Sequence, residues 1–126
     1  MGTMSVELNH TIVHSRDKKV SADFVGHILG LEVGDQWGPF IPIQAANGVT
    51  LDFMDSTDIK PQHYAFLVSD EEFDQIFARI KEAGIHYWAD PGHSLPGEIN
   101  RHYGGRGVYF DDPDGHAFEA ITAPYA

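Results

Sequence analysis

Four side chains with the chemistry of metal ligands fall at matching places in two similar halves of the sequence. His10 and His63 each lie on the first predicted strand of a half, and Asp52 and Glu119 each lie on the last. Two imidazoles and one carboxylate suit divalent Fe, Mn, Ni, Co or Zn and leave coordination positions open. His10, His63 and Glu119 therefore predict a metal site, with Asp52 as a fourth ligand, direct or through water. A single histidine on a strand is more often a surface or hydrogen-bonded side chain than a metal ligand, so the prediction depends on the matching placement of the two and on Glu119.

The apolar pattern, alternating for strands and helically spaced for helices, predicts the same order in both halves: a strand, a helix and three further strands. Asp17 or Ser15 is placed to begin the first helix, and Gly30 to end it. Ser69 and Glu72 form a capping box for the second helix. Strands are expected at residues 6–14, 31–37, 40–45 and 49–54, and again at 62–69, 85–89, 107–111 and 117–122. If a pseudo-twofold axis relates the halves, equivalent strands approach each other and the candidate ligands converge.

The second half contains a segment, residues 90–106, that is rich in glycine and proline and has no counterpart in the first half. A long irregular loop is uncommon in a small domain unless it covers a site, so we expect it to close over a substrate. Its Arg101 and Arg106 would attract an anionic group of that substrate, or are solvated loop charges. Four aromatic residues would line the pocket, or belong to the core and rim: Trp37, Phe40, Trp88 and Tyr103.

The composition excludes several classes of function. The chain has 126 residues, 42% of them hydrophobic, which predicts one globular domain. The net charge of −11 disfavours nucleic acid and anionic membranes as partners. The absence of cysteine excludes a disulfide scaffold, a thiolate zinc site and a cysteine nucleophile. Since no long apolar run or secretory leader is present, we expect a soluble, cytoplasmic protein.

Several segments resemble the vicinal oxygen chelate superfamily, which includes glyoxalase I, extradiol dioxygenases, fosfomycin-resistance thiol transferases and bleomycin-resistance proteins. They are Asn-His-Thr-Ile-Val at 9–13, Leu-Gly-Leu at 29–31, His-Tyr-Ala-Phe at 63–66, and residues 109–119. The most specific part is the Asp-Pro-Asp-Gly-His turn at 112–116 followed by Glu119. The resemblance implies an α+β fold in which two βαβββ modules, about 5–55 and about 60–124, form a cupped mixed sheet around a metal site. The helices lie outside.

The same resemblance implies how the protein works. It makes His10, His63 and Glu119 the metal ligands, and it implies a homodimer in which His10 of one chain meets the other two ligands of its partner. The expected activity is that of a glyoxalase-like lyase or isomerase, or of a dioxygenase, on a small oxygenated molecule. The ion would chelate two neighbouring substrate oxygens and stabilise an enediolate or oxyanion. Glu119 or Asp52 would carry the proton.

Three departures from the family pattern bear on which member this is. Asp52 stands where glyoxalase I has Glu, the common extradiol dioxygenases have four modules, and the segment after Thr122 is shorter than the basic tail of the fosfomycin enzymes. His116 is expected to be structural, or to orient a ligand.

The alternative function is a dimer that sequesters a drug or natural product without turnover, and a third is a metal-bound structural remnant without a substrate. Bleomycin-type binding proteins usually lack these ligands.

Overall fold

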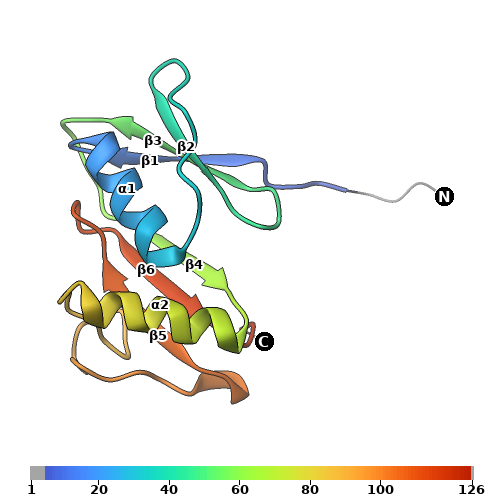
Figure 1. Ribbon diagram of the computed structural model, residues 1–126, viewed down its shortest axis with the longest axis vertical. Coiled ribbons are helices and arrows are strands. Elements are labelled where there is room, and N and C mark those ends of the chain that lie inside the picture. Colours follow the sequence, from blue (N-terminus) through green and yellow to red (C-terminus); the bar gives the residue numbers. More distant parts are fainter. Residues whose placement is uncertain (1–4, 126) are drawn as a thin grey trace.

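The computed structural model describes residues 5–125 and contains the predicted repeat of elements (Figure 1). The first module consists of β1 (His10–Ser15), α1 (Lys18–Leu29), β2 (Phe40–Gln44) and β3 (Thr50–Asp55). The second consists of β4 (His63–Leu67), α2 (Asp70–Glu82), the short 3-10 helix η1 (His102–Gly104), β5 (Gly107–Asp111) and β6 (Ala117–Ile121). The α+β class with two related modules is therefore confirmed.

Each module builds its own mixed three-stranded sheet, and the two sheets have the same topology. The strand orders are β1-β3-β2 and β4-β6-β5. In both, the first strand pairs parallel with the last, and the strand between them in sequence pairs antiparallel with the last. The expected single cupped sheet is wrong for one chain, because the described strands form two separate sheets, with β1 at the edge of one and β4 at the edge of the other.

Two expected strands are reduced to isolated bridges. In the stretch 31–37, Val33 pairs with Ile43, and the Gly34 N–H donates to the Pro42 carbonyl at 2.9 Å. Pro42 has no N–H to return, so this ladder cannot extend. The stretch 85–89 forms bridges only through Trp88. The first strand also starts later than expected, at residue 10 instead of 6, because its partner β3 begins at residue 50, opposite residue 10.

Local signals determine where the helices begin and end. The Asp17 carboxylate caps α1, and Gly30 ends it in the left-handed region at φ 71°, where glycine carries no steric penalty. The predicted capping box of α2 is present. The Ser69 N–H donates to the Glu72 carboxylate at 2.8 Å, and the Glu72 N–H donates to the Ser69 hydroxyl at 3.1 Å. None of the helices within residues 5–125 is long and apolar enough to cross a membrane.

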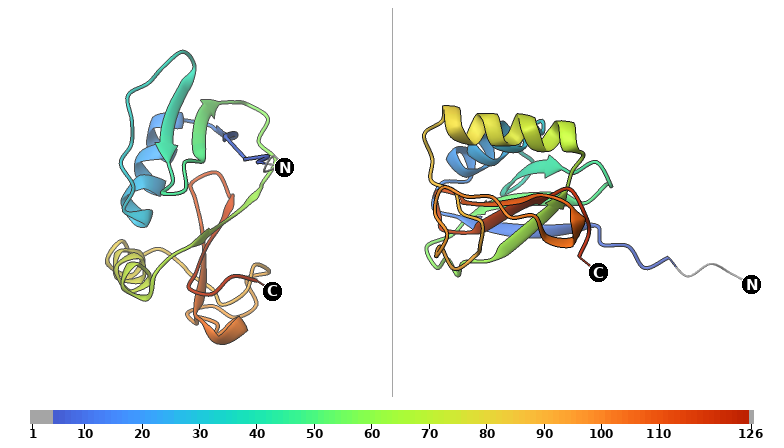
Figure 2. Two further views of the ribbon diagram at one scale, coloured as in Figure 1. Left: turned by 90° about the vertical axis from the view of Figure 1, so that its right-hand side faces the viewer. Right: turned by 90° about the horizontal axis from the view of Figure 1, so that it is seen from below.

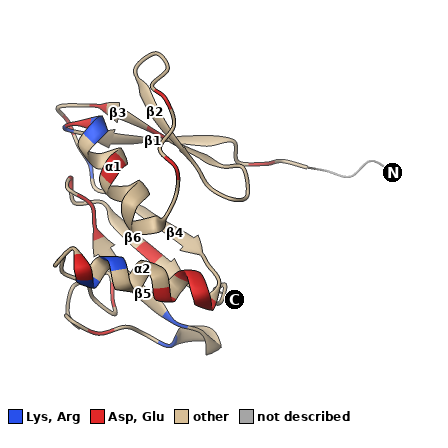
Figure 3. Cartoon of the chain, viewed as in Figure 1, with Lys and Arg blue, Asp and Glu red and all other residues tan. Residues whose placement is uncertain are grey.

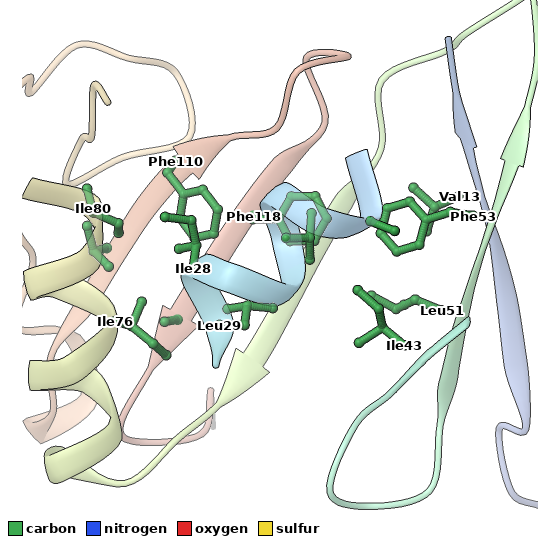
Figure 4. Packing of buried hydrophobic residues seen from close by; sticks show 14 of the residues in the cluster. Val13, Ile28, Leu29, Ile43, Leu51, Phe53, Ile76, Ile80, Phe110 and Phe118 are labelled. Atoms are coloured by element: carbon green, nitrogen blue, oxygen red, sulfur yellow. The ribbon is translucent and has the colours of Figure 1, made fainter. Parts of the chain in front are cut away.

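The apolar side chains of both modules form one continuous core (Figure 4). Val13 and Phe53 contribute from the first sheet, and Phe110 and Phe118 from the second, all completely buried. Both helices lie on the same side of the sheets (Figure 2). From α1, Phe24 reaches across to Phe110, with 6.3 Å between the ring centroids. The modules thus exclude water from each other's interior.

The turn at 112–116 joins the two modules with hydrogen bonds. The Asp114 carboxylate accepts from the Arg16 backbone N–H at 3.0 Å and from the Arg16 guanidinium at 3.1 Å. The buried His116 ring spans the junction, because its Nδ1 accepts from the Gln62 N–H at 3.0 Å and its Nε2 lies 2.8 Å from the His14 carbonyl. These contacts require the proton on Nε2. His116 therefore links the second module to β1 of the first, which is the structural one of the two roles expected for it.

Candidate metal centre

Strands β4 and β6 bring two of the predicted ligands into contact. Ala65 lies opposite Glu119 in the parallel pair, and His63 is two residues earlier on the same face of β4. The His63 Nε2 lies 2.9 Å from the Glu119 Oε1. The Glu119 side chain is completely buried, whereas the His63 side chain is 45% exposed. An ion or ligand would therefore reach this pair from the His63 side.

The first module carries an equivalent but separate pair. His10 and Asp52 hold the same register positions in the first sheet as His63 and Glu119 hold in the second. Asp52 is 3% exposed, and its Oδ1 has no hydrogen-bond partner among residues 5–125. A buried carboxylate oxygen without a donor is costly, so Asp52 Oδ1 is an open acceptor for a cation or a hydrogen-bond donor. The His10 ring is exposed and contacts the Asn9 side chain at 2.7 Å.

A single chain does not assemble the full predicted set. Within residues 5–125, no three His, Cys, Asp or Glu side chains lie close enough to hold a metal ion. The structure thus brings together His63 and Glu119, and leaves His10 and Asp52 in the other sheet. The donor types fit a borderline divalent ion, and the open Asp52 Oδ1 fits one as well, but His63 and Glu119 alone supply two ligands.

Two tyrosines complete the surroundings of Glu119. The Tyr125 hydroxyl donates to Glu119 Oε2, and the Tyr109 hydroxyl lies 3.2 Å from that of Tyr125. Burial, reinforced by the neighbouring carboxylate, raises the pKa of both tyrosines, so both stay neutral at physiological pH. Sequence reasoning missed them. The register between β5 and β6 places Tyr109 opposite Glu119 and offered a signal, but no pattern pointed to Tyr125.

The aromatic residues expected around a substrate lie in three places. Tyr103 packs against Tyr125, with 4.9 Å between ring centroids, and is thus beside the Glu119 cluster. The Trp88 ring stacks on the ring of His93 in the 90–106 loop, with 3.6 Å between the ring centroids. Trp37 and Phe40 form a pair at 5.0 Å in the first module, where Trp37 is more than half exposed. Tyr103 thus adjoins the Glu119 cluster through Tyr125, and Trp88 adjoins it through its backbone pairing with Tyr109, whereas Trp37 and Phe40 lie in the other module.

The two arginines of the loop differ in their surroundings. The Arg106 guanidinium binds Asp74 at 2.7 Å and Asp70 at 3.0 Å, and it lies over the Phe73 ring. These partners lie on α2, whose first turn is one of the acidic places on the molecule (Figure 3). Arg106 is thus engaged in fastening the loop to this helix. Arg101 is exposed and precedes η1.

His63 lines two cavities. The larger, of about 530 Å³, lies between the modules, where Leu8 and Leu51 of the first face Leu67 and Ile76 of the second. The smaller, of about 390 Å³, is more polar and includes Lys60 among its lining residues. Cavities of this size accommodate small organic ligands. An organic molecule therefore has room beside the exposed edge of the His63–Glu119 pair.

Comparisons with known proteins agree with this architecture. The family model described as Glyoxalase/Bleomycin resistance protein/Dioxygenase superfamily matches residues 7–120. The solved structure of Oxidase ChaP-H2 is 62% identical and has a TM-score of 0.95, with 98% of each chain covered. Oxidase ChaP-H1 is 58% identical with a TM-score of 0.94, covering 97% of this chain and 99% of that one. Glutathione transferase FosA from Serratia marcescens is 29% identical over 92% of this chain and 80% of its own length. The chain therefore belongs to the glyoxalase, bleomycin resistance protein and dioxygenase superfamily, as the resemblance in its sequence implied.

Proposed function

We propose that the protein is a divalent-metal-dependent enzyme of the dioxygenase type that acts on a small organic molecule with two neighbouring oxygen atoms. The observation that carries the proposal is the buried Glu119 carboxylate in contact with the partly exposed His63 imidazole. The two similar solved structures are named oxidases, which favours a reaction with O₂ over that of an isomerase or lyase, and the family description includes dioxygenases. We therefore propose a dioxygenase-type reaction. In such a reaction both atoms of O₂ enter the product, so the substrate supplies all the electrons and no separate reductant is needed.

The ligand set would be completed in a homodimer, by His10 of a second copy. Two observations support this arrangement. In the described strands, β1 pairs only with β3 and β4 pairs only with β6, so each has an edge available to another chain. Apolar side chains near these edges are largely exposed, among them Leu8 and Leu67. Each dimer would then hold two sites, and the partner's Asp52, with its open Oδ1, would be a fourth ligand.

When bound, the ion would supply Lewis acidity to two neighbouring oxygens of the substrate. The chain's own residues perform the remaining tasks. His63 faces the cavities from which a substrate arrives, and Glu119 is shielded from water and fixed by Tyr125. If Asp52 stays outside the ligand set, its open Oδ1 would instead take the proton of a substrate hydroxyl.

Metal analysis of the purified protein tests this proposal. We expect the wild-type chain to retain a divalent ion and His63→Ala to lose it. His27→Ala, which removes an exposed histidine from α1, is the matched control and should retain the ion. Equal metal content in wild type and His63→Ala would contradict the proposal. Oxygen uptake with a panel of catechols, α-hydroxyketones and hydroxyquinones should then depend on the bound ion.

The second candidate function is sequestration of a drug or natural product without turnover. The cavity of about 530 Å³ favours it, because its walls are largely apolar side chains and its volume suits a drug-sized ligand. Chelation separates the two candidates. If chelation leaves ligand affinity unchanged and no product accumulates, the protein is a binding protein. If chelation abolishes product formation, it is an enzyme.

A further inference from the structure

We propose that Tyr125 is a positioning residue that fixes the orientation of the Glu119 carboxylate for metal binding, an inference that rests on the proposed metal-dependent function. The two oxygens of Glu119 have different partners. Oε2 accepts a hydrogen bond from the Tyr125 hydroxyl, and Oε1 lies 2.9 Å from His63 Nε2. Two contacts on opposite oxygens define the plane of the carboxylate, so Oε1 is directed toward the imidazole that would share the ion.

Tyr125 is itself held in place by the segment that carries it. After β6 the chain is tied to the loop by Thr122, whose N–H donates to the Arg106 carbonyl at 2.9 Å and whose hydroxyl accepts from the Arg106 N–H at 2.8 Å. The Tyr125 ring then packs on Tyr103, and its hydroxyl contacts Tyr109 at 3.2 Å. Anchors on the backbone, the ring and the hydroxyl leave the side chain little freedom.

The first module provides an internal comparison. Asp52 occupies the register position of Glu119, but the residue opposite it on the neighbouring strand is Pro42, whereas Tyr109 lies opposite Glu119. Proline offers no donor, and Asp52 Oδ1 is left without a partner. Among the described residues, the Glu119 carboxylate therefore has a tyrosine hydroxyl bound to it, and the Asp52 carboxylate has no such donor on Oδ1. We infer that Glu119 is the carboxylate on which tight metal binding depends, with Asp52 secondary.

Hydrogen bonds to a metal-binding carboxylate contribute measurably to affinity. Loss of such an outer partner typically weakens metal binding by about 10- to 100-fold. Without the Tyr125 hydroxyl, Glu119 Oε2 would be a buried acceptor lacking its donor, and the carboxylate would turn to relieve this. The rotation removes Oε1 from its place beside His63.

Titration of the metal-free protein with Co(II) tests the role of Tyr125, because Co(II) reports both its affinity and, through its visible absorption, its coordination geometry. We expect Tyr125→Phe to raise the Kd for Co(II) by about 10-fold or more and to change the absorption spectrum. Tyr87→Phe is the control. Tyr87 packs on Phe77 of α2, away from the Glu119 cluster, and its hydroxyl makes no hydrogen bond to any described residue, so this variant should bind like wild type. A Kd for Tyr125→Phe within twofold of wild type, with an unchanged spectrum, would overturn the inference.

The same titration distinguishes failure of this inference from failure of the proposed function. If wild type binds Co(II) and His63→Ala does not, the metal site stands, and the result for Tyr125→Phe decides the positioning role alone. If wild type and His63→Ala bind equally, or neither binds, the proposed function fails and the positioning role fails with it. Thermal melts that agree among the variants would show that the folded state is intact. Tyr125 is almost half exposed, so replacing its hydroxyl leaves the core undisturbed.

Discussion

A metal site divided between two chains has a consequence that a site within one chain does not have. His10 lies on β1 of the first sheet, and His63 and Glu119 lie together in the second. If the complete set combines His10 of one chain with the pair of the other, two inactive variants will complement each other. We expect a dimer of one His10→Ala chain and one His63→Ala chain to recover one functional site.

The size of the recovery follows from this division. In the mixed dimer, one site lacks both His10 and His63, while the other receives intact ligands from both chains. A two-fold symmetric dimer has two such sites, so the mixed dimer should retain about half of the wild-type metal content. Each variant by itself should retain close to none.

Co-expression with two different affinity tags allows the mixed dimer to be purified and its metal measured. A dimer of His63→Ala with Glu119→Ala is the matched control, because both changes fall in the same module and leave each site damaged. Recovery in the first dimer and none in the control is the expected result. If the purified mixed dimer of His10→Ala and His63→Ala carries no metal, the shared site is refuted.

Three further predictions concern the module junction and the first module. His116→Ala should lower the free energy of unfolding by about 2–4 kcal/mol in urea denaturation, because it removes two hydrogen bonds and leaves a backbone donor and acceptor without partners; a loss below 0.5 kcal/mol would speak against the junction role. Burial alone would raise the pKa of Asp114, but hydrogen bonds from Ser21 and Arg16 outweigh it and lower the pKa. A lowered folded pKa stabilises the protein above the unfolded value of about 4, so this stabilisation should be lost as the pH falls below it, and Asp114→Asn should flatten that part of the stability curve; equal acid sensitivity of the variant and wild type would count against the assignment. Asp52→Ala should weaken Co(II) binding less than Glu119→Ala does. A larger loss of Co(II) affinity in Asp52→Ala would contradict the inference that Glu119 is the more important of the two carboxylates.

Sequence reasoning succeeded where a local signal determines local structure. The capping box of Ser69 and Glu72 is present as predicted, and Gly30 ends its helix. Comparison of the two halves also predicted that His10 and His63 are equivalent, and their registers agree. These predictions held because hydrogen bonds between near neighbours, or a repeated spacing, are written directly in the order of residues.

The failures have physical causes that no local pattern contains. The stretch 31–37 has the composition of a strand, but its hydrogen-bond ladder with β2 stops at Pro42. The sequence alone does not show that this stretch pairs beside a proline. The contact of Tyr125 with Glu119 depends on how the chain turns after β6. The separation of His10 from His63 depends on the placement of one module against the other. Equivalence in a repeat therefore predicted which residues correspond, but not which ones meet.

The shared core bears on how the protein folds. Because buried side chains run without a break from Val13 in the first module to Ile80 in the second, neither module has an interior of its own to retain when the other unfolds. The unit of cooperative folding is therefore the whole chain, and thermal or denaturant unfolding should follow a single transition in every probe. Residues paired in β1–β3 and β4–β6 are distant in sequence, and such distant pairings slow the formation of the folding nucleus. The two modules thus repeat the same strand topology, but they share one core and are expected to unfold together.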